Sequence, residues 1–229
     1  MTQAEAKTFV PPTRVPTLAE DVYRQIRTAI VERTLPPGQR VTESALADLL
    51  DVSKTPVREA LMRLREVGLV RSDGRRGLRV VNLSDDLLAD AYDVREALEL
   101  AGIERAAAGA TGNDLDAIEK AADRSLLAAQ GGDGEAFARW DAAFHLQLAA
   151  LSGNQHLLKL LRDTLDLIAA IRQGSASSQL EASTVCAGAH ADIVAALSRG
   201  DATACADRLR RHIRHGRERT TVEPPTPEV

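Results

Sequence analysis

The sequence predicts a mainly α-helical protein in two parts, a small basic N-terminal part with one hairpin and a larger acidic helical bundle. Alanine and leucine are abundant, whereas aromatic residues make up only 3% of the chain, and this composition favours helices over sheets. Residues 1–83 carry 14 Lys and Arg against 10 Asp and Glu, while residues 84–229 carry 15 against 23. The net charges are therefore +4 and −8, so we expect only the first part to bind a polyanion.

The 229-residue chain suits one large domain or two small ones, and its 44% apolar fraction is sufficient for a real core. Residues 1–16 and 220–229 are polar and proline-bearing, and we expect both segments to be disordered. The N-terminus has no apolar signal region, and no apolar run is long enough to span a membrane. The two cysteines, Cys186 and Cys205, suit a reducing compartment. We therefore expect a cytoplasmic protein with no membrane partner.

The N-terminal part, residues 17–83, begins with two predicted helices. Thr17 is placed to cap the first, whose apolar residues recur at helical spacing, and "LPPG" at Leu35–Gly38 ends it. Thr42 is placed to cap a second, shorter helix, and "DVS" at 51–53 then turns the chain.

The third helix has a basic face opposite an apolar one. We predict Thr55 as its N-cap, Pro56 as its first residue and Gly68 as its end. The apolar stripe contains Val57, Ala60, Leu61, Leu64 and Val67, and the opposite face contains Lys54, Arg58, Met62 and Arg65. Such a helix fits the major groove of DNA, where arginine binds guanine and hydroxyl groups bind phosphates. The alternative is an amphipathic helix whose basic face only meets solvent.

Two short strands follow, "LVRS" at 69–72 and "LRVVNL" at 78–83, joined by "DGRRG" at 73–77. A short helix, a tight turn, a basic helix and a hairpin together predict a winged helix-turn-helix.

The N-terminal part contains a specific sequence motif. "VTESALADLLDVSKTPVREALMRLREVGLV", followed by "RRGLRVV", closely resembles the winged helix-turn-helix of GntR-family bacterial transcription regulators over roughly residues 17–83. The resemblance implies a homodimer on a palindromic double-stranded DNA operator, with DNA contacts from Ser44, Ser53, Lys54, Thr55, Arg58, Arg75, Arg76 and Gly77. Asp51 stands where the family usually has glycine and Lys54 where it commonly has arginine. Lysine keeps the charge but lacks the bidentate fork.

The second part, residues 84–219, is predicted to be an all-helical bundle. Ser84 followed by two aspartates is typical of a helix start. Turn-forming segments then divide the chain into about six helices, at "GATGND" (109–114), "GGDG" (131–134), "SGN" (152–154), "GSASS" (174–178) and "RGD" (199–201).

This part contains a candidate metal site. Asp141 and His145 are four residues apart and share one helix face, and we place His190 and His212 on the inward faces of two later helices. One carboxylate and three imidazoles can bind a divalent cation and leave positions open for water or a ligand. The alternative for Asp141 and His145 is a simple surface pair. Cys186, one turn before His190, is either a competing soft ligand or a buried inert thiol, and we favour the thiol.

The motifs "DVREALELAGIERAA" and "WDAAFHLQLAALSGNQHLLKL" resemble the all-helical effector-binding domain (FCD) of FadR-type GntR regulators. The resemblance implies that Asp141, His145, His190 and His212 bind a divalent metal ion, with zinc favoured and nickel or manganese as alternatives. This histidine set is typical of members that bind a small carboxylate or hydroxy-acid rather than an acyl-CoA. It further implies effector contacts from Arg95, Asn154 and Arg172, although Arg95 also suits a surface ion pair and Asn154 a helix cap.

The sequence therefore predicts a DNA-binding transcriptional regulator, favoured as a repressor, whose operator binding responds to a small organic acid bound near a metal ion. We expect no enzyme activity, because no general base or nucleophile accompanies the four ligands. Two alternatives are a metal-dependent enzyme and a metal-stabilised dimerisation module in the second part.

Overall fold

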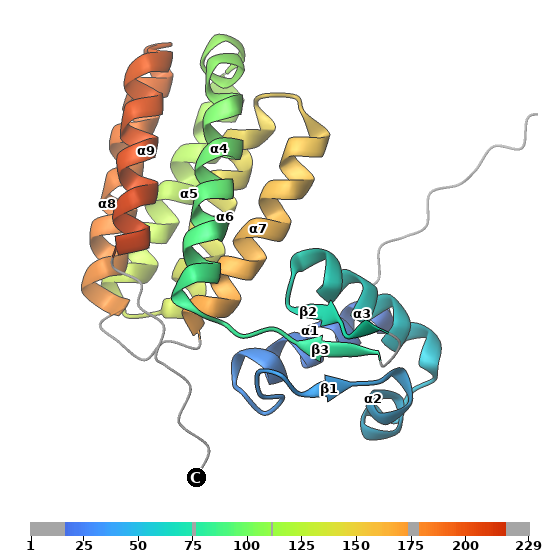
Figure 1. Cartoon of the computed structure of the whole chain (residues 1–229). Helices are drawn as coiled ribbons and strands as arrows, with labels where there is room; N and C mark the ends of the chain where they lie inside the picture. Colours follow the sequence, from blue (N-terminus) through green and yellow to red (C-terminus); the bar gives the residue numbers. More distant parts are fainter. Residues whose placement is uncertain (1–16, 75–76, 111, 174–178, 219–229) are drawn as a thin grey trace, which may run out of the picture.

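The computed structural model describes residues 17–74, 77–110, 112–173 and 179–218. Within these residues the chain forms nine helices and one small antiparallel sheet, arranged as a winged N-terminal head beside a bundle of long helices (Figure 1). The predicted fold class is confirmed. The two arginines at the tip of the hairpin, Arg75 and Arg76, lie outside the described residues.

The head contains three helices and three short strands. These are α1 (Leu18–Val31), β1 (Arg40–Val41), α2 (Glu43–Leu50), α3 (Lys54–Val67), β2 (Val70–Ser72) and β3 (Leu78–Val80). The strand order is β1-β3-β2 and both pairings are antiparallel. The sequence predicted β2 and β3 but not β1, which is only two residues long and acquires its conformation from pairing with β3.

The start of α3 differs from the prediction. Ser53, not Thr55, is the N-cap, so Pro56 is the third residue of the helix rather than the first. Proline is tolerated there because the first N–H groups of a helix have no partner within the helix. With Ser53 as the N-cap, Lys54 and Thr55 lie in the first turn of α3. Ser53 makes no side-chain capping hydrogen bond, so its hydroxyl is not committed to the helix end.

The remaining turns of the head follow the sequence closely. Thr17 forms a reciprocal capping box with Glu20, and the hydroxyl of Thr42 accepts a hydrogen bond from the Ala45 amide. Asp51 ends α2 in the left-handed region with a φ of 52°. Glycine favours that conformation, and aspartate is among the few other residues that adopt it readily. This explains how Asp51 can occupy a position where the related sequences usually have glycine.

Six helices form the bundle: α4 (Asp85–Gly109), α5 (Gly112–Gln130), α6 (Gly134–Ala150), α7 (Gln155–Gln173), α8 (Gln179–Ser198) and α9 (Ala202–Glu218). They run roughly parallel or antiparallel to one another in Figure 1. Ser84 caps α4 as predicted, because its hydroxyl accepts a hydrogen bond from the Leu87 amide. The bundle therefore begins immediately after the hairpin, and only a short segment of chain connects β3 to α4.

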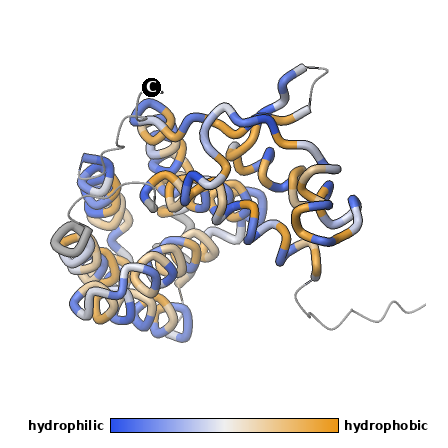
Figure 2. Tube along the Cα trace, turned by 90° about the horizontal axis from the view of Figure 1, so that it is seen from below, coloured by the Kyte–Doolittle hydropathy of each residue, from blue (hydrophilic) through white to orange (hydrophobic). Residues whose placement is uncertain are grey.

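The head and the bundle share one continuous apolar core. The buried cluster extends from α1 and α3 through Leu83 and Leu88 into the bundle, and hydrophobic and hydrophilic stretches alternate along the helices in Figure 2. Helix α7 makes the direct contacts to the head: the Arg27 guanidinium donates to the Asp166 carbonyl at 3.4 Å, and Lys159 pairs with Glu66 at 3.7 Å. Among the described residues, no helix combines the length and apolar character needed to cross a membrane.

Two glycines should respond oppositely to alanine. Gly68 ends α3 with a φ of +88°, where an added Cβ would meet only Leu167 at an ordinary 3.8 Å. Gly68→Ala should therefore lower the free energy of unfolding by about 1–2 kcal/mol through backbone strain. Gly188, inside α8, has open space around its Cα. Gly188→Ala should raise stability by about 0.5–1 kcal/mol. Urea unfolding measures both changes, and shifts of the same sign would contradict the different backbone constraints assigned to the two glycines.

Candidate metal centre and nucleic-acid interface

Four side chains from three helices of the bundle converge on one point. Asp141 and His145 come from α6, His190 from α8 and His212 from α9, and one ligand atom from each lies within 4.8 Å of every other. All four residues are buried. The structure thus brings together the four residues that the sequence predicted, and excludes the surface-pair alternative for Asp141 and His145.

A buried carboxylate orients the first histidine. The Nδ1 of His145 lies 2.6 Å from Glu99 Oε2, so we assign the ring proton to Nδ1, which donates to the carboxylate. The other oxygen of Glu99 accepts from Arg95 Nε at 2.7 Å. This arrangement leaves the Nε2 lone pair of His145 directed at Asp141 and His212, as in carboxylate–histidine–metal triads. The sequence placed Arg95 in the site but missed Glu99, although Glu99 lies four residues later on the same helix face.

A serine orients the second histidine. The Ser125 hydroxyl donates to the Ala122 carbonyl at 2.7 Å, and its oxygen lies 3.0 Å from His190 Nδ1. Because the hydroxyl proton is already used, Ser125 accepts from His190 Nδ1–H, and Nε2 is left with its lone pair. The Phe144 ring stacks on that imidazole at 4.0 Å. No pattern in the sequence predicted Ser125.

The third histidine faces the first. His212 Nε2 lies 3.0 Å from His145 Nε2, and the sulfur of Cys186 lies 3.8 Å from both ring nitrogens of His212. In the metal-free protein His212 Nε2–H donates to the His145 lone pair. A cation held by both nitrogens would require the ring proton of His212 to lie on Nδ1, so that both Nε2 atoms offer lone pairs.

The polar atoms of the cluster fit a metal ion. Asp141 Oδ1 and His190 Nε2 are buried without a hydrogen-bond partner, although they lie 3.3 Å apart. Burial alone would raise the pKa of Asp141, but the neighbouring imidazoles lower it well below its ordinary value. The buried carboxylate oxygen and the His190 nitrogen thus face each other without a hydrogen bond of good geometry, and a cation between them would bind both. Nitrogen and carboxylate donors of this kind suit zinc and its first-row neighbours.

The three residues predicted to bind an effector differ in burial and in their distance from the cluster's charges. Arg95 is 2% exposed, and its Nη2 atom has no hydrogen-bond partner. Arg172, on α7, lies in the same electrostatic environment: burial lowers its pKa, but Tyr92 and Asp141 raise it by more. Asn154 is exposed, and its side-chain oxygen accepts from the Leu157 amide at 3.1 Å. It therefore acts as the cap of α7, the alternative that the sequence left open.

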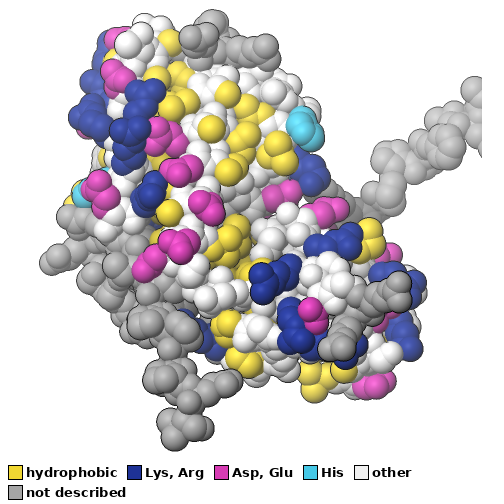
Figure 3. Space-filling model, in the orientation of Figure 1, with side chains coloured by type: hydrophobic (Ala, Val, Ile, Leu, Met, Phe, Trp, Pro, Cys, Tyr) yellow, Lys and Arg dark blue, Asp and Glu magenta, His cyan; other side chains and the backbone are white. Residues whose placement is uncertain are grey.

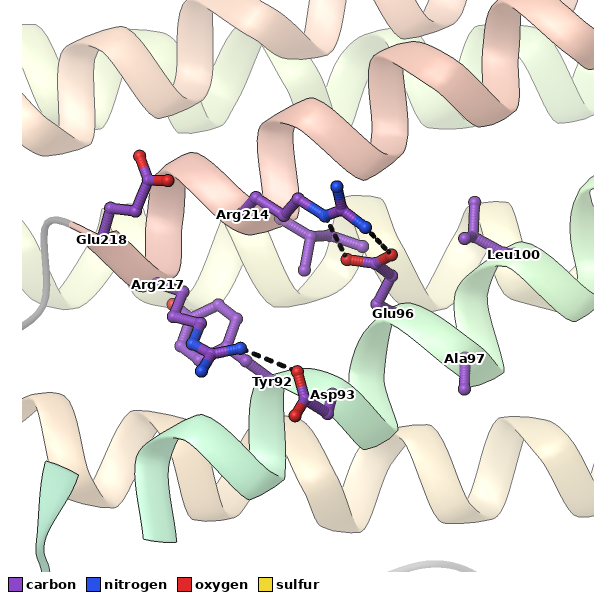
Figure 4. Close-up of a pocket in the computed structure, with 9 residues that line it drawn as sticks. Tyr92, Asp93, Glu96, Ala97, Leu100, Arg214, Arg217 and Glu218 are labelled. Atoms are coloured by element: carbon purple, nitrogen blue, oxygen red, sulfur yellow. Dashed lines mark hydrogen bonds and ion pairs between the residues drawn. The ribbon is translucent and has the colours of Figure 1, made fainter. Parts of the chain in front are cut away.

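One sizeable cavity lies away from the cluster. It is a groove of about 690 Å³ between α4 and α9, where Arg214 pairs with Glu96 and Arg217 with Asp93 (Figure 4). Figure 3 shows the same boundary, with basic side chains over α9 next to acidic ones over α4. These four groove residues pair with one another, whereas Asp141 Oδ1 and His190 Nε2 in the cluster have no hydrogen-bond partner. A smaller cavity of about 280 Å³ between α8 and α9 is lined by His212 and Cys186 themselves.

The head presents the predicted DNA-binding residues to solvent. The described members of the set are exposed: Ser44, Ser53, Lys54, Thr55, Arg58 and Gly77. The apolar stripe beneath them is buried, and Val57 and Leu64 are both 0% exposed. Arg58 is held by Glu43 of α2 through two hydrogen bonds, from Nε at 3.0 Å and from Nη2 at 2.8 Å. This pair, which the sequence did not predict, fixes the arginine at the exposed N-terminal end of α3.

Comparison with known protein families shows which family this chain belongs to. The model of the bacterial regulatory proteins of the gntR family matches residues 18–80, and that of the FCD domain matches residues 90–215. The chain belongs to the GntR family. It is therefore a transcriptional regulator with an N-terminal helix-turn-helix and a C-terminal FCD domain.

Individual relatives of this GntR regulator agree. The probable D-xylose utilization operon transcriptional repressor of Paenarthrobacter nicotinovorans is 31% identical over 199 residues, which cover 86% of each chain. The uncharacterized HTH-type regulator YdhC of Bacillus subtilis is 32% identical over 147 residues, 64% of this chain and 66% of that protein. The structure of E. coli McbR/YncC superposes with a TM-score of 0.68 at 22% identity, covering 87% of this chain and 95% of that one, and shows a common fold. The relatives are regulators, not enzymes, as expected.

The metal-free GntR regulator should lose stability in mild acid. Burial and the adjacent His145 and His190 lower the pKa of His212 well below its ordinary 6.5. Below pH 6.5 the unfolded chain therefore takes up a proton that the folded chain rejects, which costs up to about 1.4 kcal/mol per pH unit and site. Urea unfolding in EDTA at pH 7.5 and 5.5 should show this loss, and His212→Gln should reduce it. Substitution of the exposed His156 by Gln is the control, and an equal effect of both variants would contradict the assignment.

Proposed function

We propose that this GntR regulator is a repressor that binds a palindromic operator as a homodimer. A small carboxylate or hydroxy-acid, bound beside a divalent metal ion in the FCD domain, releases it from DNA. The observation that carries the proposal is the buried cluster of Asp141, His145, His190 and His212, with partnerless polar atoms aimed inside. Such a site is suited to binding rather than to catalysis.

Zinc is the favoured metal because three imidazoles and one carboxylate match its ligand preferences, with nickel and manganese as alternatives. When bound, the metal ion supplies an open position for a carboxylate oxygen. Arg95 is the complementary cation: its Nε is bound to Glu99, while its Nη2 is free to donate to the same anion. Arg172 supplies further positive charge on the α7 side. Together these residues favour a small anion over a long apolar chain.

Helix α7 is the proposed connection between effector and DNA. It carries Arg172 near the cluster, and Asp166 and Leu167 against the head. An effector changes operator affinity only if it binds the two arrangements of head and bundle with different affinity. A shift of α7 toward a bound anion would move its contacts with α1 and α3. The two heads of a dimer would then no longer match half-sites one helical turn apart.

The repressor assignment draws on the relative from P. nicotinovorans, whose name describes it as a probable transcriptional repressor. Access to DNA places the protein in the cytoplasm in this proposal. The residues proposed to contact DNA are those of the exposed α2–α3 surface and the wing, with Arg58 as the principal base contact.

Loss of Arg58 tests the DNA interface. Arg58→Ala should weaken operator binding by about 10- to 100-fold per half-site, because a bidentate arginine–guanine contact is lost. Fluorescence anisotropy with labelled operator DNA measures the change, and the melting temperature should stay unchanged. Arg24→Ala is a matched control, since Arg24 is also exposed in the head and paired with an acid, Asp21. Equal operator affinity of Arg58→Ala and wild type would refute the interface.

Ligand titrations test the metal and the effector separately. Zinc at a thousandfold excess over its Kd should stabilise the folded protein by about 4 kcal/mol. Asp141→Asn should lose most of this effect, whereas Asp123→Asn, on the exposed face of α5, should keep it. Thermal melts with zinc and then with lactate, malate or citrate measure both steps.

An active acid should raise the melting temperature further and release operator DNA. Arg95→Lys should abolish that second step but retain the zinc effect, while Arg162→Lys, exposed on α7, should retain both. Stabilisation by zinc without any response to acids would instead favour the alternative in which the metal only stabilises a dimerisation module. Turnover of a small acid by the zinc-loaded protein would favour the metal-dependent enzyme.

A further inference from the structure

We propose that the pocket between α8 and α9 binds a small dianion, which carries either one phosphate or two carboxylates. The pocket has a volume of about 280 Å³ and lies beside the candidate metal site, since His212 belongs to both. The inference goes beyond the proposed function. Arg95 and Arg172, the arginines proposed to bind the effector, are not among the residues that line this pocket, and the dianion needs no metal ion to bind here.

Helix α9 carries arginines on two faces, and the two faces differ in their partners. The arginines on the face toward α4 all pair with acidic side chains, and they are Arg210, Arg214 and Arg217. Arg208 and Arg211 lie on the other face and line the pocket with residues of α8. Among the residues that the structure describes, neither of these two arginines forms an ion pair with an acid. The pocket therefore contains two positive charges without a protein counter-charge bound to them.

Two nitrogens at this pocket lack a hydrogen-bond partner. Within the described part of the chain, Nη1 of Arg208 and Nε2 of His215 are buried and unpartnered. Arg208, Arg211 and His215 are three and four residues apart, so their side chains share one face of α9. A guanidinium nitrogen only donates, and an imidazole nitrogen donates when it carries the ring proton. An oxygen acceptor in the pocket would satisfy both nitrogens, and an oxyanion would do so most strongly.

The lining of the pocket indicates the class of the anion. Each guanidinium can bind two oxygens of a carboxylate or a phosphate, and two guanidiniums match two negative charges. Val185 and Ala189 of α8 supply apolar surface on the opposite wall, which suits a short carbon chain. The volume lies near the lower limit of about 300 Å³ for ligand pockets and excludes a large cofactor. The exposed acid Asp192 also lines the pocket, and its charge opposes a bound anion.

Anion titrations of the metal-free protein test the proposal. Isothermal titration calorimetry of the full-length chain in EDTA, at constant ionic strength, uses inorganic phosphate and succinate as dianions and acetate as a monoanion. Phosphate or succinate should bind at one site per chain and about tenfold or more tighter than acetate, because it engages both arginines. The dianion that binds tighter shows whether the natural ligand carries a phosphate or two carboxylates.

Substitutions in the lining should change this affinity in opposite directions. Arg208→Gln and Arg211→Gln should each weaken dianion binding by about tenfold, since each variant loses charge-assisted hydrogen bonds. Asp192→Asn should strengthen binding by about two- to fivefold, because it removes a negative charge at the pocket. Arg214→Gln is the matched control on the other face of the same helix, and it should leave the affinity unchanged. Thermal melts of all four variants check that they are folded.

The outcomes separate this site from the proposed effector site. No binding of either dianion, or equal losses in Arg208→Gln, Arg211→Gln and Arg214→Gln, would overturn the proposal. Arg95→Lys should keep the dianion affinity of the metal-free protein, and a loss in that variant would assign the anion to the effector site instead. Dianion binding that depends on Arg208 and Arg211 in a protein that zinc fails to stabilise would support this pocket and refute the proposed metal centre.

Discussion

The carboxylate of Glu99 is the group on which the candidate metal centre depends. It is 3% exposed, and it binds His145 through one oxygen and Arg95 through the other. A buried carboxylate is strongly unfavourable unless both oxygens are satisfied, and removing either partner would leave a buried charge without compensation. The same contacts set the tautomer of His145 and leave one edge of Arg95 unpaired. One side chain thus links the metal ligand to the proposed anion contact.

The site also draws on every helix of the bundle. The four cluster residues come from α6, α8 and α9. Glu99 on α4 and Ser125 on α5 orient the histidines. Helix α7 contributes Arg172, whose positive charge interacts with Asp141. An ion or anion bound at the centre would therefore lie among side chains contributed by all six helices. Helix α7 also contacts α1 and α3, so in the proposed mechanism it connects the site to the head. A site confined to one helix pair would have no comparable influence on the DNA-binding surface.

Much of this arrangement could be predicted from sequence because local rules determine it. The caps at Thr17, Thr42 and Ser84, the end of α3 at Gly68 and the Asp141–His145 spacing all depend on neighbours within a few residues.

The features that sequence missed depend on tertiary contacts. The two-residue strand β1 exists only through its pairing with β3, and Ser125 reaches His190 across 65 positions of sequence. The start of α3 was misplaced because proline suits several positions of a first turn, and only the backbone geometry at Ser53 shows which one it occupies. The pairing of Arg58 with Glu43 likewise needed the relative positions of α2 and α3.

Two arginine–glutamate ion pairs in this chain show how burial determines whether an ion pair is permanent or exchangeable. The Arg95–Glu99 pair is almost fully buried, so exchange of either partner with water is costly and the pair acts as a permanent part of the site. The Arg58–Glu43 pair has side chains 60% and 36% exposed. Water screens it, so a phosphate or a guanine edge can replace the glutamate at little cost. The exposed pair can therefore hold Arg58 in an extended, ordered conformation before DNA arrives and still release it on contact. The buried pair, by contrast, holds His145 and Arg95 in defined positions beside the candidate metal site.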